Sequence, residues 1–160
     1  TGETRTPQFL ALNAAGQVPL VILEDGRPLA QSNAIMLHLA DGSALIPPEA
    51  YARARMLEWM FWEQYSHEPY IAVARFRVRY LGVAVADLDP SLMARGRAAL
   101  ARMELGLAQS AFLVGDQASL ADIALAAYTR MAHEGGFDLA DYPAVQAWVG
   151  RVEAALRIAD

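Results

Sequence analysis

Two short apolar segments separated by Asp25-Gly26 limit the folds that this chain can adopt. Residues 19–24 are apolar, rich in branched side chains and short enough for a buried strand. A second short segment begins at Arg27, directly after the glycine. Asp-Gly between two such runs predicts a β-hairpin, because a tight primed turn needs positive φ, which glycine adopts readily. An isolated hairpin is marginally stable, so other elements have to pack on it.

Helices are predicted on both sides of the hairpin. Thr6 as N-cap and Pro7 as first residue predict a short helix over residues 6–12. Apolar spacing over residues 32–40 predicts a second helix, which Gly42 ends. Residues 1–42 therefore have the order helix, strand, strand, helix, which is typical of the second half of a small α/β domain.

The remainder of the chain is predicted to be a helical domain. Residues 43–48 look like a linker, and every long segment within residues 49–160 has helical periodicity. The expected helices cover roughly 49–82, with a bend near Glu68-Pro69, then 91–110, 120–132 and 143–158. The predicted fold class is α+β and mostly helical.

Composition excludes several function classes. The net charge of −5 and the pI near 5.1 argue against nucleic acid or an anionic membrane as partner. There is no cysteine, and therefore no thiolate nucleophile or Cys-ligated metal. His67 and His133 each precede a glutamate but lack the second histidine of a zinc-protease helix, so no metal is indicated. No apolar stretch is long enough for a membrane span, which indicates a soluble intracellular protein.

Two short motifs are candidate ligand sites. Gln17-Val18-Pro19 precedes the first strand. If the Val18–Pro19 bond is cis, the N–H and C=O of Val18 turn outward and can pair with an extended peptide-like ligand; a trans proline that opens the strand is the alternative. Gln31-Ser32 begins the second helix, where Ser32 is either the N-cap or a ligand for a carboxylate, with Gln31 as an additional donor. Both alternatives remain open at each motif.

The helical domain contains one folding motif and one aromatic cluster. Ser119 and Asp122 have the spacing of a capping box, a structural device and not a catalytic pair. Aromatic residues crowd one helix, which predicts contacts with its own bundle and with a second surface, either a partner subunit or a ligand cleft: Trp59, Phe61, Trp62, Tyr65 and Tyr70. A central core helix is the alternative. Arg75 and Arg79 share a helical face that meets either an acidic substrate or solvent.

Taken together, these motifs resemble the glutathione transferase family. The matching segments follow one another over nearly the whole chain: 17–19, the hairpin at 25–26, Gln-Ser-Asn-Ala-Ile at 31–35, Phe-Leu-Val-Gly-Asp at 112–116 and Ser-Leu-Ala-Asp-Ile at 119–123. The resemblance implies a partial thioredoxin-like N-terminal domain, followed by an all-α bundle, in a cytoplasmic homodimer that uses glutathione as co-substrate.

The resemblance also implies roles for individual residues. Pro19 would be cis, and the backbone of Val18 would pair with the cysteinyl part of glutathione. Gln31 and Ser32 would hold the γ-glutamyl carboxylate, and Gln17 would reach the glycyl end. Three further residues would line the pocket of a small hydrophobic electrophile: Tyr70, Arg75 and Arg79.

The implied activity is the transfer of the glutathione thiolate to that electrophile, a detoxification reaction. In this family a tyrosine, serine or cysteine near the end of the first strand activates the thiol. That strand, the first helix and the second strand have no counterpart here, so no residue is assigned as catalytic. We expect roughly 35 or more residues to precede Thr1 in the complete protein. A non-catalytic glutathione-binding or association module is the alternative function.

Overall fold

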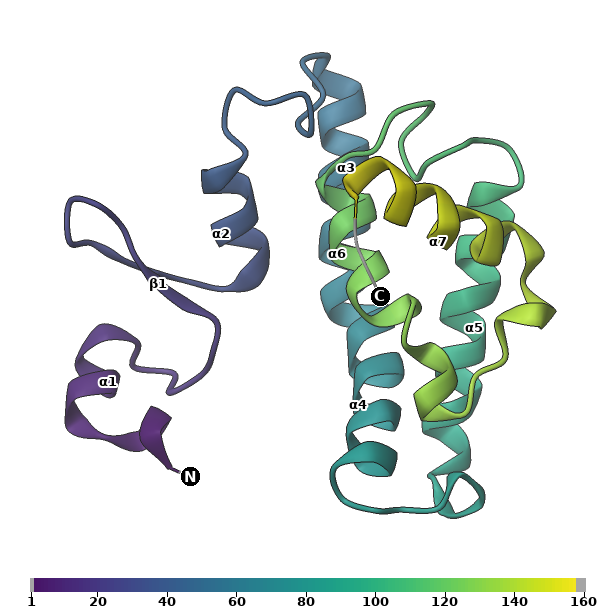
Figure 1. Ribbon diagram of the computed structural model, residues 1–160, viewed down its shortest axis with the longest axis horizontal. Helices are drawn as coiled ribbons and strands as arrows, with labels where there is room; N and C mark the ends of the chain where they lie inside the picture. The colour runs from purple at the N-terminus through teal and green to yellow at the C-terminus, as the bar shows by residue number, and fades with distance from the viewer. Residues whose placement is uncertain (1, 158–160) are drawn as a thin grey trace. The chain divides into compact units, whose positions relative to one another are not determined.

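The structure is a computed structural model that describes residues 2–157. The chain divides into two compact units, Thr1–Ser43 and Ala44–Asp160, called unit 1 and unit 2 below (Figure 1). The division falls at the start of the linker predicted over 43–48. The backbone N–H of Leu120 donates to the carbonyl of Leu45, which attaches that segment to unit 2.

Unit 1 has the predicted order of helix, strand, strand and helix. Its elements are the 3₁₀ turn η1 (Glu3–Arg5), α1 (Pro7–Leu12), β1 (Leu20–Ile22), β2 (Pro28–Ala30) and α2 (Ser32–Leu39). Thr6 caps α1, as predicted, because its side chain accepts a hydrogen bond from the N–H of Phe9 at 3.3 Å. Pro7 fits the first position of α1, because a backbone N–H there would have no intrahelical partner.

The hairpin forms, with a longer connection than the sequence predicts. Leu20 pairs with Ala30, and the strands run antiparallel. The N–H of Leu23 donates to the carbonyl of Arg27, so residues 24–26 form a three-residue loop. Only Gly26 in this loop has positive φ, at 85°. The prediction of a two-residue primed turn is therefore wrong. The loop instead matches a three-residue connection that ends in one residue with left-handed backbone angles.

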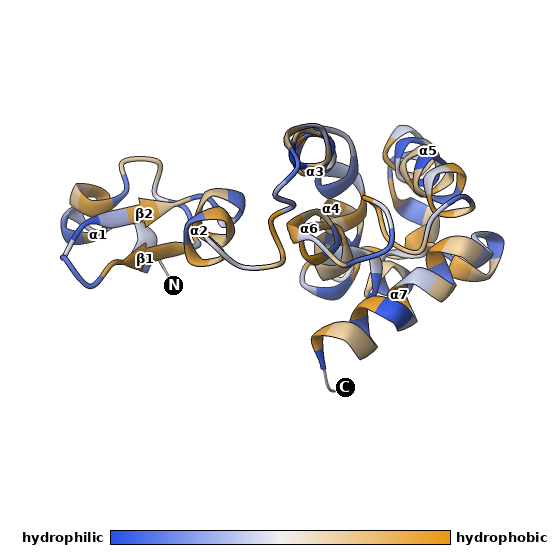
Figure 2. Ribbon diagram, turned by 90° about the horizontal axis from the view of Figure 1, so that it is seen from above, coloured by the Kyte–Doolittle hydropathy of each residue, from blue (hydrophilic) through white to orange (hydrophobic). Residues whose placement is uncertain are grey.

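Unit 1 buries little apolar surface among the described residues. Figure 2 shows β1 as hydrophobic, yet the strand is only half-buried and Ile22 is 53% exposed. Ile35 and Ala40 are the buried apolar side chains of the described part of this unit. Most of the core therefore lies in unit 2.

The described part of unit 2 is mostly helical. Its main helices within the described residues are α3 (Ala50–Trp62), α4 (Glu68–Arg79), α5 (Pro90–Leu107), α6 (Leu120–Thr129) and α7 (Pro143–Leu156). Short turns connect them: η2 (Glu63–His67), η3 (Val85–Asp87), η4 (Ala132–Gly135) and η5 (Leu139–Asp141). The helices are shorter at their C-terminal ends than predicted. Figure 1 shows α3 and α4 as successive parts of one long column, with α5 beside it.

The predicted bend in the first long helix has a different cause. The segment η2 is a π-helical turn inserted between α3 and α4. Pro69 lies in the first turn of α4, where a missing N–H disrupts no hydrogen bond of the helix. The extra residue of the π turn, and not the proline, therefore interrupts the helix.

The capping box at the start of α6 is confirmed and is part of the core. Asp122 is fully buried, and its carboxylate accepts the N–H of Ser119 at 2.8 Å. The same carboxylate accepts the N–H of Leu113 at 2.9 Å and the indole N–H of Trp148 at 2.8 Å. One carboxylate thus links α6, α7 and the preceding loop. Among residues 2–157, no helix is long and apolar enough to cross a membrane.

Candidate functional site

The hairpin brings the two predicted ligand motifs of unit 1 to the same end. The pair formed by Leu20 and Ala30 is the last of the ladder. Residues 17–19 directly precede the first of these strands, and Gln31-Ser32 directly follow the second. The two motifs therefore lie side by side, although more than ten residues separate them in the sequence.

Val18 presents unpaired backbone groups. The Val18–Pro19 bond is cis, as the resemblance implies. The side chain of Val18 is 70% exposed. Within the described part of the chain, neither its N–H nor its carbonyl has a hydrogen-bond partner. The preceding residue is held in place, because the amide of Asn13 donates to the carbonyl of Gln17 at 2.7 Å.

Gln31 and Ser32 form the start of α2 in an unusual conformation. Gln31 has a φ of 74°, which is rare for a residue with a side chain and is typical of functional positions. Its carbonyl accepts the N–H of Ile35 at 2.9 Å, so Gln31 is the N-cap residue and its side chain makes no capping bond. The interpretation of Ser32 as N-cap is therefore wrong, since Ser32 is the first helical residue.

This arrangement can bind an anionic ligand with a peptide-like part. Among the described residues, the hydroxyl of Ser32 and the side-chain amides of Gln17 and Gln31 have no protein partner. The hydroxyl lies at the N-terminal end of α2, where backbone N–H groups and the helix dipole favour a carboxylate. The free backbone groups of Val18 can accept and donate hydrogen bonds as a strand edge does.

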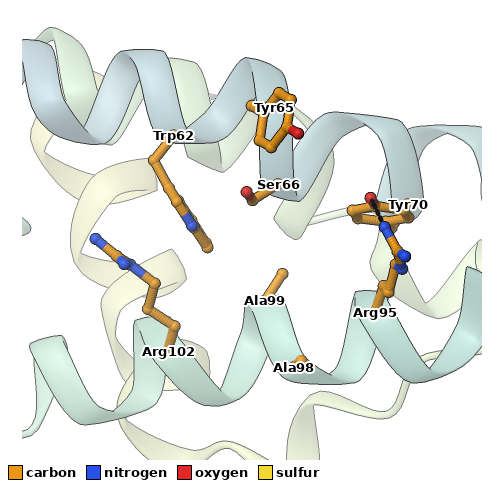
Figure 3. A pocket seen from close by; sticks show the side chains of 8 residues that line it. All are labelled: Trp62, Tyr65, Ser66, Tyr70, Arg95, Ala98, Ala99 and Arg102. Carbon is orange, nitrogen blue, oxygen red and sulfur yellow. Dashed lines mark hydrogen bonds between the residues drawn. The ribbon is translucent and has the colours of Figure 1, made fainter.

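A separate pocket lies within unit 2, between the α3–α4 column and α5 (Figure 3). Its volume is about 290 Å³. Aromatic and basic side chains line it, together with a serine and two alanines: Trp62, Tyr65, Ser66, Tyr70, Arg95, Ala98, Ala99 and Arg102. In Figure 3 Trp62 points toward Arg102, and Tyr70 lies over Arg95.

Each arginine of the pocket packs on aromatic rings. The Arg102 guanidinium lies 4.8 Å from the ring centre of Trp62 and 5.0 Å from that of Trp59. Arg95 donates a 2.8 Å hydrogen bond to the Tyr70 hydroxyl and lies 5.6 Å from that ring centre. These cation–π contacts hold both cations at the pocket wall.

Arg75 and Arg79 do not line this pocket. Arg75 donates to the carboxylate of Glu134 at 2.6 Å, and Arg79 lies 3.5 Å from the same oxygen. The segment that carries Glu134 lies close to α4 because its next residue is a glycine. A Cβ at Gly135 would lie 2.9 Å from the backbone nitrogen of Arg75. Of the three residues predicted for an electrophile pocket, only Tyr70 therefore belongs to the pocket of Figure 3.

The sequence interpretation missed Arg95 and Arg102. They are seven residues apart on α5, which places them on one helical face two turns apart. This spacing was visible in the sequence. Their position opposite Trp62 and Tyr70 was not, because it depends on how α5 packs against the α3–α4 column.

The π turn places a histidine in the core. His67 is fully buried, and its Nε2 lies 2.9 Å from the hydroxyl of Thr129. That hydroxyl donates its own hydrogen to the carbonyl of Leu125 at 2.8 Å, so it accepts from His67. The other ring nitrogen, Nδ1, has no hydrogen-bond partner among residues 2–157. Burial lowers the pKa of His67 from 6.5 to about 4.

Two family models match the chain. The glutathione S-transferase N-terminal domain matches residues 1–41, and the glutathione S-transferase C-terminal domain matches residues 64–155. The chain belongs to the glutathione S-transferase family. Unit 1 corresponds to part of the thioredoxin-like N-terminal domain of that family, and unit 2 corresponds to the helical C-terminal domain. The predicted family and fold class are both confirmed.

Similar proteins include bacterial members of the family. A glutathione S-transferase structure from Pseudomonas fluorescens Pf-5 is 50% identical, with a TM-score of 0.94, and the match covers 99% of this chain and 80% of that one. A glutathione S-transferase structure from Xanthobacter autotrophicus Py2 is 53% identical, with a TM-score of 0.90, over 94% of this chain and 75% of that one. The disulfide-bond oxidoreductase YfcG of Escherichia coli K12 is 28% identical over 92% of this chain and 72% of its own length.

Proposed function

We propose that this chain binds glutathione through unit 1 and serves a glutathione transferase reaction. The observation that carries the proposal is that two features lie at the same end of the hairpin. They are the unpaired backbone groups of Val18 and the free hydroxyl of Ser32 at the start of α2. Glutathione is a peptide-like anion, so it needs both a strand-like partner and a carboxylate site. The family model for the N-terminal domain matches the same residues.

Each residue has a stated role in this proposal. The N–H and carbonyl of Val18, which cis Pro19 follows, pair with the cysteinyl backbone of glutathione. The Ser32 hydroxyl and the Gln31 amide donate to the γ-glutamyl carboxylate, with the positive end of the α2 dipole behind them. The Gln17 amide donates to the glycyl carboxylate.

The chemical step is attack by the bound thiolate. A hydrogen-bond donor that favours the thiolate lowers the pKa of the glutathione thiol, so that more of it is ionised at neutral pH. The sulfur then forms a bond to an electrophilic carbon, and the leaving group departs with the electron pair of the broken bond. We assign no residue of this chain as the thiol-activating donor. Tyr70, Arg75 and Arg79 stay candidates for contact with the electrophile.

We also propose that the protein works as a homodimer. Large apolar side chains of the α3–α4 column face outward, with Phe61 72% and Tyr65 82% exposed. Exposed aromatic residues close together are typical of association surfaces. The homodimer that the family resemblance implies would cover them.

Calorimetric titration with glutathione tests the proposed site. Ser32→Ala removes a hydrogen bond to a charged group, which is worth ~1.5–3 kcal/mol, so affinity should fall about tenfold to a hundredfold. Ser66→Ala, at a serine of unit 2, should bind as the parent protein does. Equal affinity of the Ser32 variant and the parent would remove Ser32 from the site.

A turnover assay separates the enzyme from a binding module. The parent protein is mixed with glutathione and 1-chloro-2,4-dinitrobenzene, and formation of the thioether is followed by absorbance. Turnover that falls in the Ser32 variant supports transfer. Glutathione binding without turnover of this electrophile or of a disulfide probe would favour the non-catalytic alternative.

A further inference from the structure

We propose that Asp41 is a site of isoaspartate formation, whereas Arg27 protects the same kind of site at Asp25. Both aspartates are exposed, and each is followed by a glycine, Gly26 or Gly42. Asp-Gly is the dipeptide that isomerises most readily, because glycine has no Cβ to hinder attack by its backbone nitrogen. The two sites therefore differ in their surroundings. The proposal concerns spontaneous modification of the chain and does not rest on the proposed transferase function.

The reaction rearranges the backbone and needs only water. The glycine nitrogen forms a bond to the side-chain carboxyl carbon of the aspartate and gives up its proton. One carboxyl oxygen leaves with the electron pair of its broken bond, as water, and a succinimide ring closes. Water then adds to the ring carbonyl that belonged to the backbone, the bond from this carbon to the nitrogen breaks, and the nitrogen regains a proton. The backbone now runs through the aspartate side chain and is longer by one carbon.

At Asp25 both reacting groups are engaged in hydrogen bonds. The carboxylate accepts the Nε–H of Arg27 at 2.7 Å and the backbone N–H of Arg27 at 3.1 Å. These bonds, the side-chain one most, lower the pKa of Asp25 and keep it ionised, whereas loss of water requires the protonated acid. The N–H of Gly26 donates to the carbonyl of Leu23 at 2.9 Å, which directs the attacking nitrogen elsewhere. Ring closure at Asp25 therefore has to break all of these bonds.

At Asp41 both reacting groups are free within the described part of the chain. The carboxylate has no hydrogen-bond or ion-pair partner among residues 2–157, and the N–H of Gly42 has no acceptor there. Other groups close the turn that contains them, since the N–H of Ser43 donates to the carbonyl of Ala40 at 2.9 Å. A Cβ at Gly42 would meet open space, so no neighbouring atom blocks the nitrogen. The same chemistry is therefore unopposed at this second Asp-Gly pair.

The position of Asp41 gives the modification a structural consequence. Asp41 directly follows Ala40, the C-cap residue of α2, and unit 1 ends at Ser43. Isomerisation would add one carbon to the backbone between these two residues, which the closing hydrogen bond of the turn spans. The product keeps one carboxylate, so the net charge is unchanged. The modification therefore alters the geometry of the chain segment that leads from unit 1 to unit 2.

Ageing of the folded protein at neutral pH in H₂¹⁸O tests the proposal. An endoprotease that cuts before aspartate, but not before isoaspartate, then reports on each site by mass spectrometry. Isomerisation at Asp41 leaves residues 25–86 as one uncut fragment, whereas isomerisation at Asp25 leaves residues 1–40 uncut. We expect the fragment of residues 25–86 to accumulate faster, with one heavy oxygen from hydrolysis of the ring.

Three variants test the causes of this difference. Arg27→Gln removes the guanidinium at an exposed position and should raise the rate at Asp25 by about twofold to fivefold, the range of an exposed ion pair, without changing the rate at Asp41. Arg97→Gln makes the same charge change at an exposed position of α5 and should change neither rate. Asp41→Glu should take up no heavy oxygen at this position, because the longer side chain does not form the five-membered ring.

Unfolding in concentrated urea separates the effect of the fold from that of the local sequence. In urea the two aspartates should isomerise at similar rates, because the hydrogen bonds of the hairpin no longer hold Asp25. Equal rates at both sites in the folded parent, an unchanged Asp25 rate in the Arg27 variant, or a preference for Asp41 that persists in urea would each overturn the proposal. Aged parent protein without the uncut fragment of residues 25–86 would overturn it as well.

Discussion

Acid should destabilise this protein through one buried histidine. His67 donates from Nε2 to Thr129, so its neutral form is the native one. A second proton would have to bind at Nδ1, which is buried and has no acceptor nearby among the described residues. The protonated ring would thus be a buried cation with an unsatisfied N–H, whereas in the unfolded chain water solvates it.

The size of the effect follows from the shift in pKa. Burial lowers the pKa of His67 from 6.5 to about 4, and each unit corresponds to about 1.4 kcal/mol. The contribution of His67 to the free energy of unfolding is therefore complete above pH 6.5, declines as pH falls, and is lost by about pH 4. The total loss is about 3 kcal/mol, of which about 2 kcal/mol is already lost at pH 5.

Urea denaturation at pH 8 and at pH 5 measures this loss. His67→Gln keeps a donor for Thr129 but does not titrate, so the variant should lose about 2 kcal/mol less than the parent between the two pH values. The matched control, His38→Gln, changes an exposed histidine of unit 1 and should keep the dependence of the parent. If the parent and the His67 variant lose the same free energy of unfolding, the reasoning is refuted.

Three other predictions concern stability and association. Asp122→Ala leaves the indole N–H of Trp148 and two backbone N–H groups without an acceptor. Urea denaturation should therefore show that the free energy of unfolding falls by about 3 kcal/mol or more. A fall below about 1 kcal/mol would contradict the role of this network. Gly135→Val places atoms against the backbone of Arg75, where a Cβ would lie at 2.9 Å, and should lower the melting temperature. Gly150→Val, at a glycine with open space around its Cβ position, is its control. Phe61→Ser should shift the protein toward monomer in light scattering if the exposed face of α3 forms the dimer contact, and an unchanged mass would exclude that face.

Much of the local structure was predictable because its causes are local. Thr6 caps α1 through a residue three positions away, and Ser119 and Asp122 form their capping box over the same spacing. The hairpin at Asp25-Gly26 also forms where it was predicted. The details that failed, the type of turn and the role of Ser32, depend on backbone angles that several sequences satisfy.

The two ligand motifs of unit 1 could be recognised in the sequence, but their position beside one another could not. Val18 and Ser32 each had two interpretations from their sequence context. Their proximity follows from the register that pairs Leu20 with Ala30, and the free hydroxyl of Ser32 follows from the positive φ of Gln31, which moves the N-cap back by one residue.

The sequence by itself determined the family, the order of the elements and the caps, since each depends on residue types at short, fixed spacings. Tertiary packing alone decided the partners of the polar residues on the aromatic helix. His67 meets Thr129, 62 positions away, and Arg75 meets Glu134, 59 positions away. The π turn at Glu63–His67 contains His67 and precedes Arg75, so it changes the direction in which both side chains leave the helix. Such contacts depend on how whole helices pack, because burial and complementary charge can be satisfied by many pairings until the packing selects one.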